Sequence, residues 1–103
     1  MELTSKQRKL LEKYAQPMSA IVIVGGAGVT DGIHDMLDKS LASHELLKVK
    51  FNEYKDEKET LSAELAERSN AVLVRIIGNV AIFYRPAEKA EDRKYEKELN
   101  KLS

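Results

Sequence analysis

The sequence contains no cysteine and only two histidines, which narrows the chemistry open to it. Without cysteine, the chain has no disulfide framework and no thiolate metal site. A zinc site would need carboxylates beside the histidines, and no HExxH spacing provides them. The sequence therefore predicts a protein that holds neither a metal ion nor another cofactor.

Long apolar runs are absent as well. The longest, residues 20–24 and 80–84, fall far short of the ~20 residues that a membrane-spanning helix needs. The first residues, Met1 to Lys6, contain no apolar stretch of the kind found in secretory signals. We therefore expect a cytoplasmic protein with no membrane partner.

An excess of charge of either sign is also missing, since 17 Lys and Arg residues balance 17 Asp and Glu residues. The charges are unevenly distributed, however. Residues 2–13 carry four cations and two carboxylates, whereas residues 53–68 carry six carboxylates and three cations. Such a bipolar chain can bind a polyanion on one localised face despite a neutral total. The balance therefore excludes only indiscriminate binding of polyanions.

With 103 residues and 43% hydrophobic content, the chain is long enough for one small domain with its own core. We place that domain in residues 1–86. Residues 87–103, ten of which are charged, form a C-terminal tail. Tyr95, Leu99 and Leu102 have helical spacing, so this tail either docks as a short helix or frays.

Hydrophobic periodicity predicts three helices and four strands in the domain. The expected helices cover about residues 4–16, 31–43 and 56–69, and the expected strands cover residues 20–24, 44–52, 71–77 and 80–84. The order predicts two parallel strand–helix–strand units followed by an antiparallel hairpin. The fold class is therefore α/β, of the two-layer α+β type, with a four-stranded mixed sheet.

Local signals support several of these elements. Thr4 and Gln7 have the spacing of a capping box at the first helix. Gly78-Asn79 is a type II′ hairpin turn, with glycine first. The first strand is apolar without alternation, which predicts burial on both faces and a helix over each. The second strand alternates, with Lys48 and Lys50 on its polar side.

The run Gly25-Gly26-Ala27-Gly28 lies between the first strand and a helix that Thr30 or Asp31 caps. Free amides and the helix dipole at such a place favour an anion. A dinucleotide fingerprint fails because Asp31 stands where the third glycine belongs, and a P-loop fails because GK[ST] is missing. A Gly-x-x-Gly clamp on a sugar-phosphate backbone and a plain tight turn both stay open.

Eight cations form the second candidate feature. They are Lys6, Arg8, Lys9 and Lys13 in the first helix, and Lys48, Lys50, Arg75 and Arg85 in or just after strands. Each of them can be a solvated or ion-paired surface residue, and together they can bind phosphates.

Tyr84 can stack on a base, although a place in the core is the commoner fate of such a residue. The sequence contains no GxSxG elbow and no cysteine, so we expect that the protein is not an enzyme.

Five motifs, in sequence order, resemble a known family. They are Leu3-Thr4-x-Lys6-Gln7-Arg8, Val24-Gly25-x-x-Gly28-Val29-Thr30, His44-Glu45-Leu46-Leu47-Lys48-Val49-Lys50, Val74-x-Ile76-Ile77-Gly78 and Phe83-Tyr84-Arg85-Pro86. Together they look like the CRM domain, the RNA-binding module shared by bacterial and archaeal YhbY proteins and plant organelle splicing factors. The resemblance covers about residues 3–86.

This resemblance implies a fold similar to the C-terminal domain of bacterial translation initiation factor three. It also implies an RNA-binding protein associated with precursors of the large ribosomal subunit. The Gly-x-x-Gly loop of the family maps onto Gly25 to Gly28, and its basic strand positions map onto Lys48, Lys50 and Arg85. The loop of this chain has no basic residue between its outer glycines, so it offers only backbone donors.

We therefore expect an RNA-binding module of ribosome assembly, whose partner is ribosomal RNA or a pre-ribosomal particle, with ribosomal protein contacts as a further option. The alternatives are a protein-interaction module using the acidic helices and the tail, and a small nucleotide-binding protein using the glycine loop. Substituting Asp for Gly28 is expected to weaken RNA binding and leave the fold largely intact. The expected RNA-binding residues are Gly25, Gly26, Ala27, Gly28, Thr30, Lys6, Arg8, Lys9, Lys13, Lys48, Lys50, Arg75 and Arg85.

Overall fold

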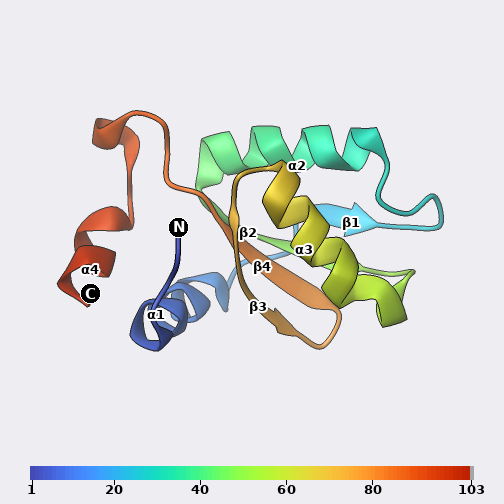
Figure 1. Cartoon of the computed structure of the whole chain (residues 1–103), viewed down its shortest axis with the longest axis horizontal. Coiled ribbons are helices and arrows are strands. Elements are labelled where there is room, and N and C mark those ends of the chain that lie inside the picture. Colours follow the sequence, from blue (N-terminus) through green and yellow to red (C-terminus); the bar gives the residue numbers. More distant parts are fainter. Residues whose placement is uncertain (103) are drawn as a thin grey trace.

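The computed structural model describes residues 1–102 and shows one sheet with helices packed around it (Figure 1). The three helices and four strands expected in residues 1–86 are all present. The elements are α1 (Ser5–Ala15), β1 (Val22–Val24), α2 (Asp31–His44), β2 (Leu46–Phe51), the 3₁₀ turn η1 (Lys55–Glu57), α3 (Lys58–Arg68), β3 (Val72–Ile77), β4 (Val80–Tyr84), the 3₁₀ turn η2 (Ala90–Asp92) and α4 (Glu96–Lys101).

The strands form a four-stranded mixed sheet in the order β1-β2-β4-β3, which confirms the predicted class. β1 and β2 are parallel, and β4 is antiparallel to both β2 and β3. β2 and β3 are therefore parallel, as the strand–helix–strand unit predicts, but they do not pair directly because β4 lies between them. Burial gives the reason: β4 is buried at four of its five residues, whereas β3 exposes Arg75 and Ile77. The strand that is apolar on both faces takes the interior position.

Two hydrophobic clusters lie on opposite faces of the sheet. One joins α2 and α3 to residues such as Phe51 and Phe83. The other joins Leu11 of α1 and Leu99 of α4 to residues such as Ile82. Since β2 and β4 present apolar side chains on both faces, each face needs a helical cover. The fold therefore has three layers rather than the expected two. No helix within residues 1–102 is long and apolar enough to cross a membrane.

β1 contradicts the expectation that the first strand is buried on both faces. Val22 and Val24 are fully buried under α2, but Ile21 and Ile23 on the other side are 44% and 41% exposed. β1 is an edge strand, and α1 packs over β2 and β3 instead of β1. A short apolar strip of the sheet therefore stays open to solvent beside α1.

The local signals at the ends of the elements are confirmed. The Thr4 hydroxyl accepts a hydrogen bond from the Gln7 backbone N–H, and the Gln7 side chain accepts one from the Thr4 N–H, at 3.2 and 2.9 Å. Gly78 has φ +60° in the turn between β3 and β4. The chain after Pro86 forms η2 and α4, and the Gln7 amide donates to the Leu99 carbonyl at 3.0 Å.

Glu45 connects α2 to β2 and holds the chain that follows β4. It is 1% exposed and has φ +63°, a left-handed value that is uncommon outside glycine. Its carboxylate accepts hydrogen bonds from the backbone N–H groups of Ala87 at 2.7 Å and Lys94 at 2.6 Å. Its carbonyl oxygen accepts another from the Arg85 N–H at 2.8 Å. Because a buried carboxylate is stable only when it is hydrogen-bonded, Glu45 fixes the path of the tail.

Replacing Glu45 with Gln should lower the free energy of unfolding by about 1–3 kcal/mol, because an amide NH₂ then faces a buried N–H donor. Urea denaturation measures this loss, and hydrogen exchange at the amides of Ala87 and Lys94 should become faster. Glu67 is exposed on α3 and provides the matched control. Glu67→Gln should change the free energy by less than about 0.5 kcal/mol. Equal stability of the two variants would contradict the role given to Glu45.

Burial, together with the charge of the nearby Glu45 carboxylate, raises the pKa of Tyr84 to about 12. The same phenol ionises near pH 10 in an unfolded chain. Because the folded state holds this proton more tightly, its contribution to stability is complete below pH 10 and is lost as the pH rises from 10 to 12. Tyr84→Phe should therefore lose less stability than the wild type over this interval in denaturation curves. Parallel pH dependences would show that Tyr84 does not cause the loss.

Candidate nucleic-acid interface

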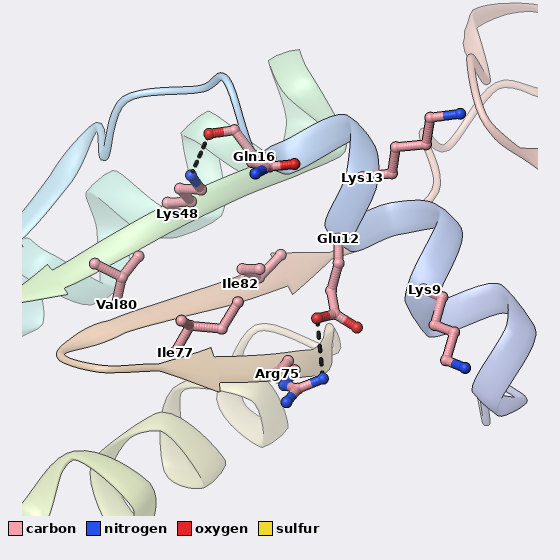
Figure 2. A pocket seen from close by; sticks show the side chains of 9 residues that line it. All are labelled: Lys9, Glu12, Lys13, Gln16, Lys48, Arg75, Ile77, Val80 and Ile82. Carbon is pink, nitrogen blue, oxygen red and sulfur yellow. Dashed lines mark hydrogen bonds and ion pairs between the residues drawn. The ribbon is translucent and has the colours of Figure 1, made fainter.

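A groove of about 520 Å³ runs between α1 and the strands β2, β3 and β4. Its lining combines cations with an apolar floor, as Figure 2 shows. The predicted residues Lys9, Lys13, Lys48 and Arg75 come together here, although they are far apart in the sequence. The full lining is Lys9, Glu12, Lys13, Gln16, Lys48, Arg75, Ile77, Val80 and Ile82.

Two of these cations hold α1 against the sheet. The Lys48 ammonium donates to the carbonyls of Gln16 at 3.1 Å and Met18 at 3.0 Å, at the C-terminal end of α1. The Arg75 guanidinium forms an ion pair with Glu12 at 3.1 Å. Free carbonyls at a helix C-terminus attract cations, so Lys48 acts as a cap for α1. Both side chains therefore have a structural partner inside the groove.

Lys9 and Lys13 differ from this pair. Both are exposed and point from α1 away from Glu12 into solvent (Figure 2). Within residues 1–102, neither ammonium has a hydrogen bond or an ion pair. Lys6 is also exposed and lies one turn before Lys9. These three lysines form a row of available positive charge along one side of α1.

Lys50 extends the charged surface toward the glycine loop. It is exposed, lies two residues after Lys48 and therefore faces the same side of the sheet. In the sheet it is opposite Val80 of β4 and Ile23 of β1. Ile23 comes two residues before Gly25, so Lys50 lies between the groove and the glycine loop. The acidic helices α2 and α3 cover the opposite face, which leaves the positive charge localised.

The glycine loop is a tight turn that continues into α2. The Gly28 N–H donates to the Gly25 carbonyl at 3.0 Å, and Gly28 has φ +76°. Thr30 caps α2 by accepting a hydrogen bond from the Ile33 N–H at 3.2 Å. Gly26 and Ala27 are exposed, and their N–H groups donate no hydrogen bond within residues 1–102. The loop therefore offers backbone donors to an anion.

Tyr54 is a neighbour of this loop that the sequence did not indicate. Its hydroxyl donates to the Gly26 carbonyl at 3.1 Å. Its ring would lie 3.3 Å from a Cβ at Gly28, so the contact depends on glycine at that position. An aromatic residue among charged ones, three residues after the end of β2, is the signal that could have found it. Arg68 was also missed, and it pairs with Asp31 at 3.5 Å beside the loop.

Arg8 and Arg85 lie outside the groove and bind backbone carbonyls. The Arg8 guanidinium donates to Leu73 at 2.8 Å and Val74 at 2.7 Å, where the pairing of β3 with β4 is irregular. The Arg85 guanidinium donates to Ser69 at 2.7 Å and pairs with Asp38 at 2.6 Å. β4 ends beside the start of β2, so Arg85 is at the other end of the sheet from the glycine loop.

Tyr84 cannot stack on a base. It is 1% exposed and belongs to the core cluster of α1 and α4, which is the commoner of the two fates that the sequence left open. Its neighbours explain the burial: the rings of Tyr84 and Tyr95 lie 6.3 Å apart in an edge-to-face arrangement. Among residues 1–102, no group of three or more His, Cys, Asp or Glu side chains could hold a metal ion.

Comparisons with known proteins agree on one family. The model of the CRS1/YhbY (CRM) domain matches residues 3–85 of this chain. A Haemophilus influenzae protein named RNA-binding protein is 31% identical over 90 residues, which cover 86% of this chain and 91% of that protein. A Pseudomonas aeruginosa protein named a probable RNA-binding protein is 34% identical over 90 residues, which cover 86% of each chain.

A solved structure has the same fold. It is the solution structure of a hypothetical protein from Staphylococcus aureus, described there as a candidate RNA-binding protein. The TM-score is 0.74 and the sequence identity is 28%, with 90% of this chain and 98% of that chain covered. The likeness therefore extends over nearly the whole domain.

Gly28 and Gly26 provide a matched pair for testing the loop geometry. Gly28→Ala should lower the free energy of unfolding by about 1–2 kcal/mol, because an L-residue is strained at φ +76° and its Cβ meets the Tyr54 ring. Gly26 has open space around it, so Gly26→Ala should be neutral or slightly stabilising in the same urea denaturation. The same strain and the same contact with Tyr54 apply to Gly28→Asp, which should therefore lower the free energy of unfolding as well. Equal stability of the two alanine variants would contradict this geometry.

Proposed function

The chain belongs to the CRS1/YhbY (CRM) domain family, and from this premise we propose that it binds RNA along the groove, Lys50 and the glycine loop. The observation that carries the proposal is the row of unpaired lysines on one face of a neutral protein. Lys9 and Lys13 line the groove, and Lys50 leads from the groove to the loop. Family membership indicates RNA as the partner, because the similar proteins described above carry names for RNA binding.

The contacts proposed for each part follow from their chemistry. The free lysines neutralise phosphates and release counterions, which makes binding depend on salt. The N–H groups of Gly26 and Ala27 donate to phosphate oxygens, which fixes the position of the backbone. Arg75 is partly neutralised by Glu12 and therefore adds less net charge. None of the described residues that line the groove is aromatic, so the groove contacts the RNA backbone rather than stacked bases.

We further propose ribosomal RNA, or a precursor of the large ribosomal subunit, as the RNA. The resemblance of the sequence motifs to the CRM domain supports this choice. The role is that of a non-enzymatic binding module in the cytoplasm, and the relatives named above carry names for RNA binding and for no reaction. Contacts with ribosomal proteins belong to the same proposal. Crosslinking in cells followed by sequencing of the bound RNA identifies the partner.

A salt titration with structured ribosomal RNA tests the lysine row. The Lys9→Gln/Lys13→Gln double variant should reduce the slope of log K against log [salt] by about two, because each phosphate contact contributes about one. The control is Lys39→Gln/Lys89→Gln, which removes the same charge from exposed positions on α2 and in the tail. The control should keep the wild-type slope. Equal slopes for both double variants would show that RNA does not contact the groove.

A further inference from the structure

Tyr54 stands out as an aromatic side chain held on the surface. It is 43% exposed and has φ +57°, a backbone conformation that is an outlier for a bulky residue. Such a conformation persists only where the surroundings determine it. Here the Tyr54 hydroxyl is tied to the Gly26 carbonyl, and the ring lies against Gly28. The fold therefore keeps this ring in a defined place beside the glycine loop.

The ring forms one wall of a cleft of about 270 Å³ between the glycine loop and α3. Apolar side chains of Val29, Leu61 and Leu65 provide the rest of the lining, together with one carboxylate, Glu64, and the guanidinium of Arg68. Tyr54 also lines a second cleft, on the side of Gly26 and η1. That second cleft is acidic, since its lining includes Glu53, Asp56 and Glu57 but only one cation, Lys55.

The charges of the first cleft decide what it can hold. The negative charge of Glu64 offsets the positive charge of Arg68, and Arg68 is already paired with Asp31. A phosphate therefore gains little there. A flat neutral ring with polar edges fits better, because it can stack on Tyr54 and contact the apolar lining. Its polar edges can accept a hydrogen bond from Arg68 and donate one to Glu64. The volume lies just below the range of drug-sized pockets, which suits a single base.

We propose that an unpaired base of the bound RNA enters this cleft and stacks on Tyr54. The proposal rests on the proposed function, because the RNA backbone must follow Lys50 and the loop for a base to reach α3. A fully paired duplex keeps its bases stacked inside and cannot fill the cleft, whereas a loop or bulge can extend one. The protein should therefore favour RNA with an unpaired nucleotide over a plain duplex.

The experiment compares two RNAs with the same number of phosphates: a hairpin with 2-aminopurine in its loop, and a fully paired duplex. The wild type should bind the hairpin more tightly and quench the 2-aminopurine fluorescence. Tyr54→Leu keeps an apolar side chain but no aromatic face, so it should lose about tenfold in hairpin affinity and the quenching. Its affinity for the duplex should change less than twofold. Tyr54→Phe keeps the ring and should behave like the wild type.

Each outcome has a distinct meaning. Failure of the wild type to bind either RNA contradicts the proposed function itself. Equal binding of both RNAs without quenching overturns the base cleft and leaves RNA binding intact. Equal losses in Tyr54→Phe and Tyr54→Leu overturn stacking, because they trace the effect to the hydroxyl bond with Gly26. The quenching in the wild type needs no variant, so a loss of folding in either variant leaves the proposal testable.

Discussion

The buried carboxylate of Glu45 is the contact on which much of the arrangement depends. It accepts backbone N–H groups on both sides of the turn η2, while the Glu45 carbonyl accepts the N–H that follows β4. The tail that it fixes ends in α4, and Leu99 of α4 packs in the cluster of α1. α1 is one wall of the cationic groove. The Glu45 carboxylate therefore influences the shape of the proposed RNA surface, because it fixes the tail and the tail packs α4 against α1.

The features that could be predicted from the sequence depend on neighbouring residues. The capping box of Thr4 and Gln7, the turn at Gly78 and the alternation of Lys48 and Lys50 each need only a few consecutive positions. The errors concern relations between distant elements. The apolar run that includes Ile23 looked like a central strand, and its exposure depends on where α1 packs. The interior place of β4 likewise depends on competition among strands.

In the candidate site, too, local features could be predicted from the sequence and contacts between distant residues could not. The sequence grouped eight cations by sign, but sign does not reveal which ammonium or guanidinium already has a partner. Lys48, Arg8 and Arg85 bind backbone carbonyls, whereas Lys9 and Lys50 have no hydrogen bond or ion pair among residues 1–102. A cationic surface could therefore be predicted from the sequence, but not which of its cations are available to a ligand. Tyr54 escaped notice because its position depends on a glycine 26 positions earlier that has no Cβ.

The separation of acidic helices from cationic lysines across the sheet has a consequence for how the molecule moves. Such a protein behaves as an electric dipole, and the field of a polyanion turns it before the two surfaces meet. Collisions are then productive in one orientation, which raises the rate of association without a net attraction at long range. A neutral protein of this design diffuses freely among the other polyanions of its surroundings and engages one only after alignment.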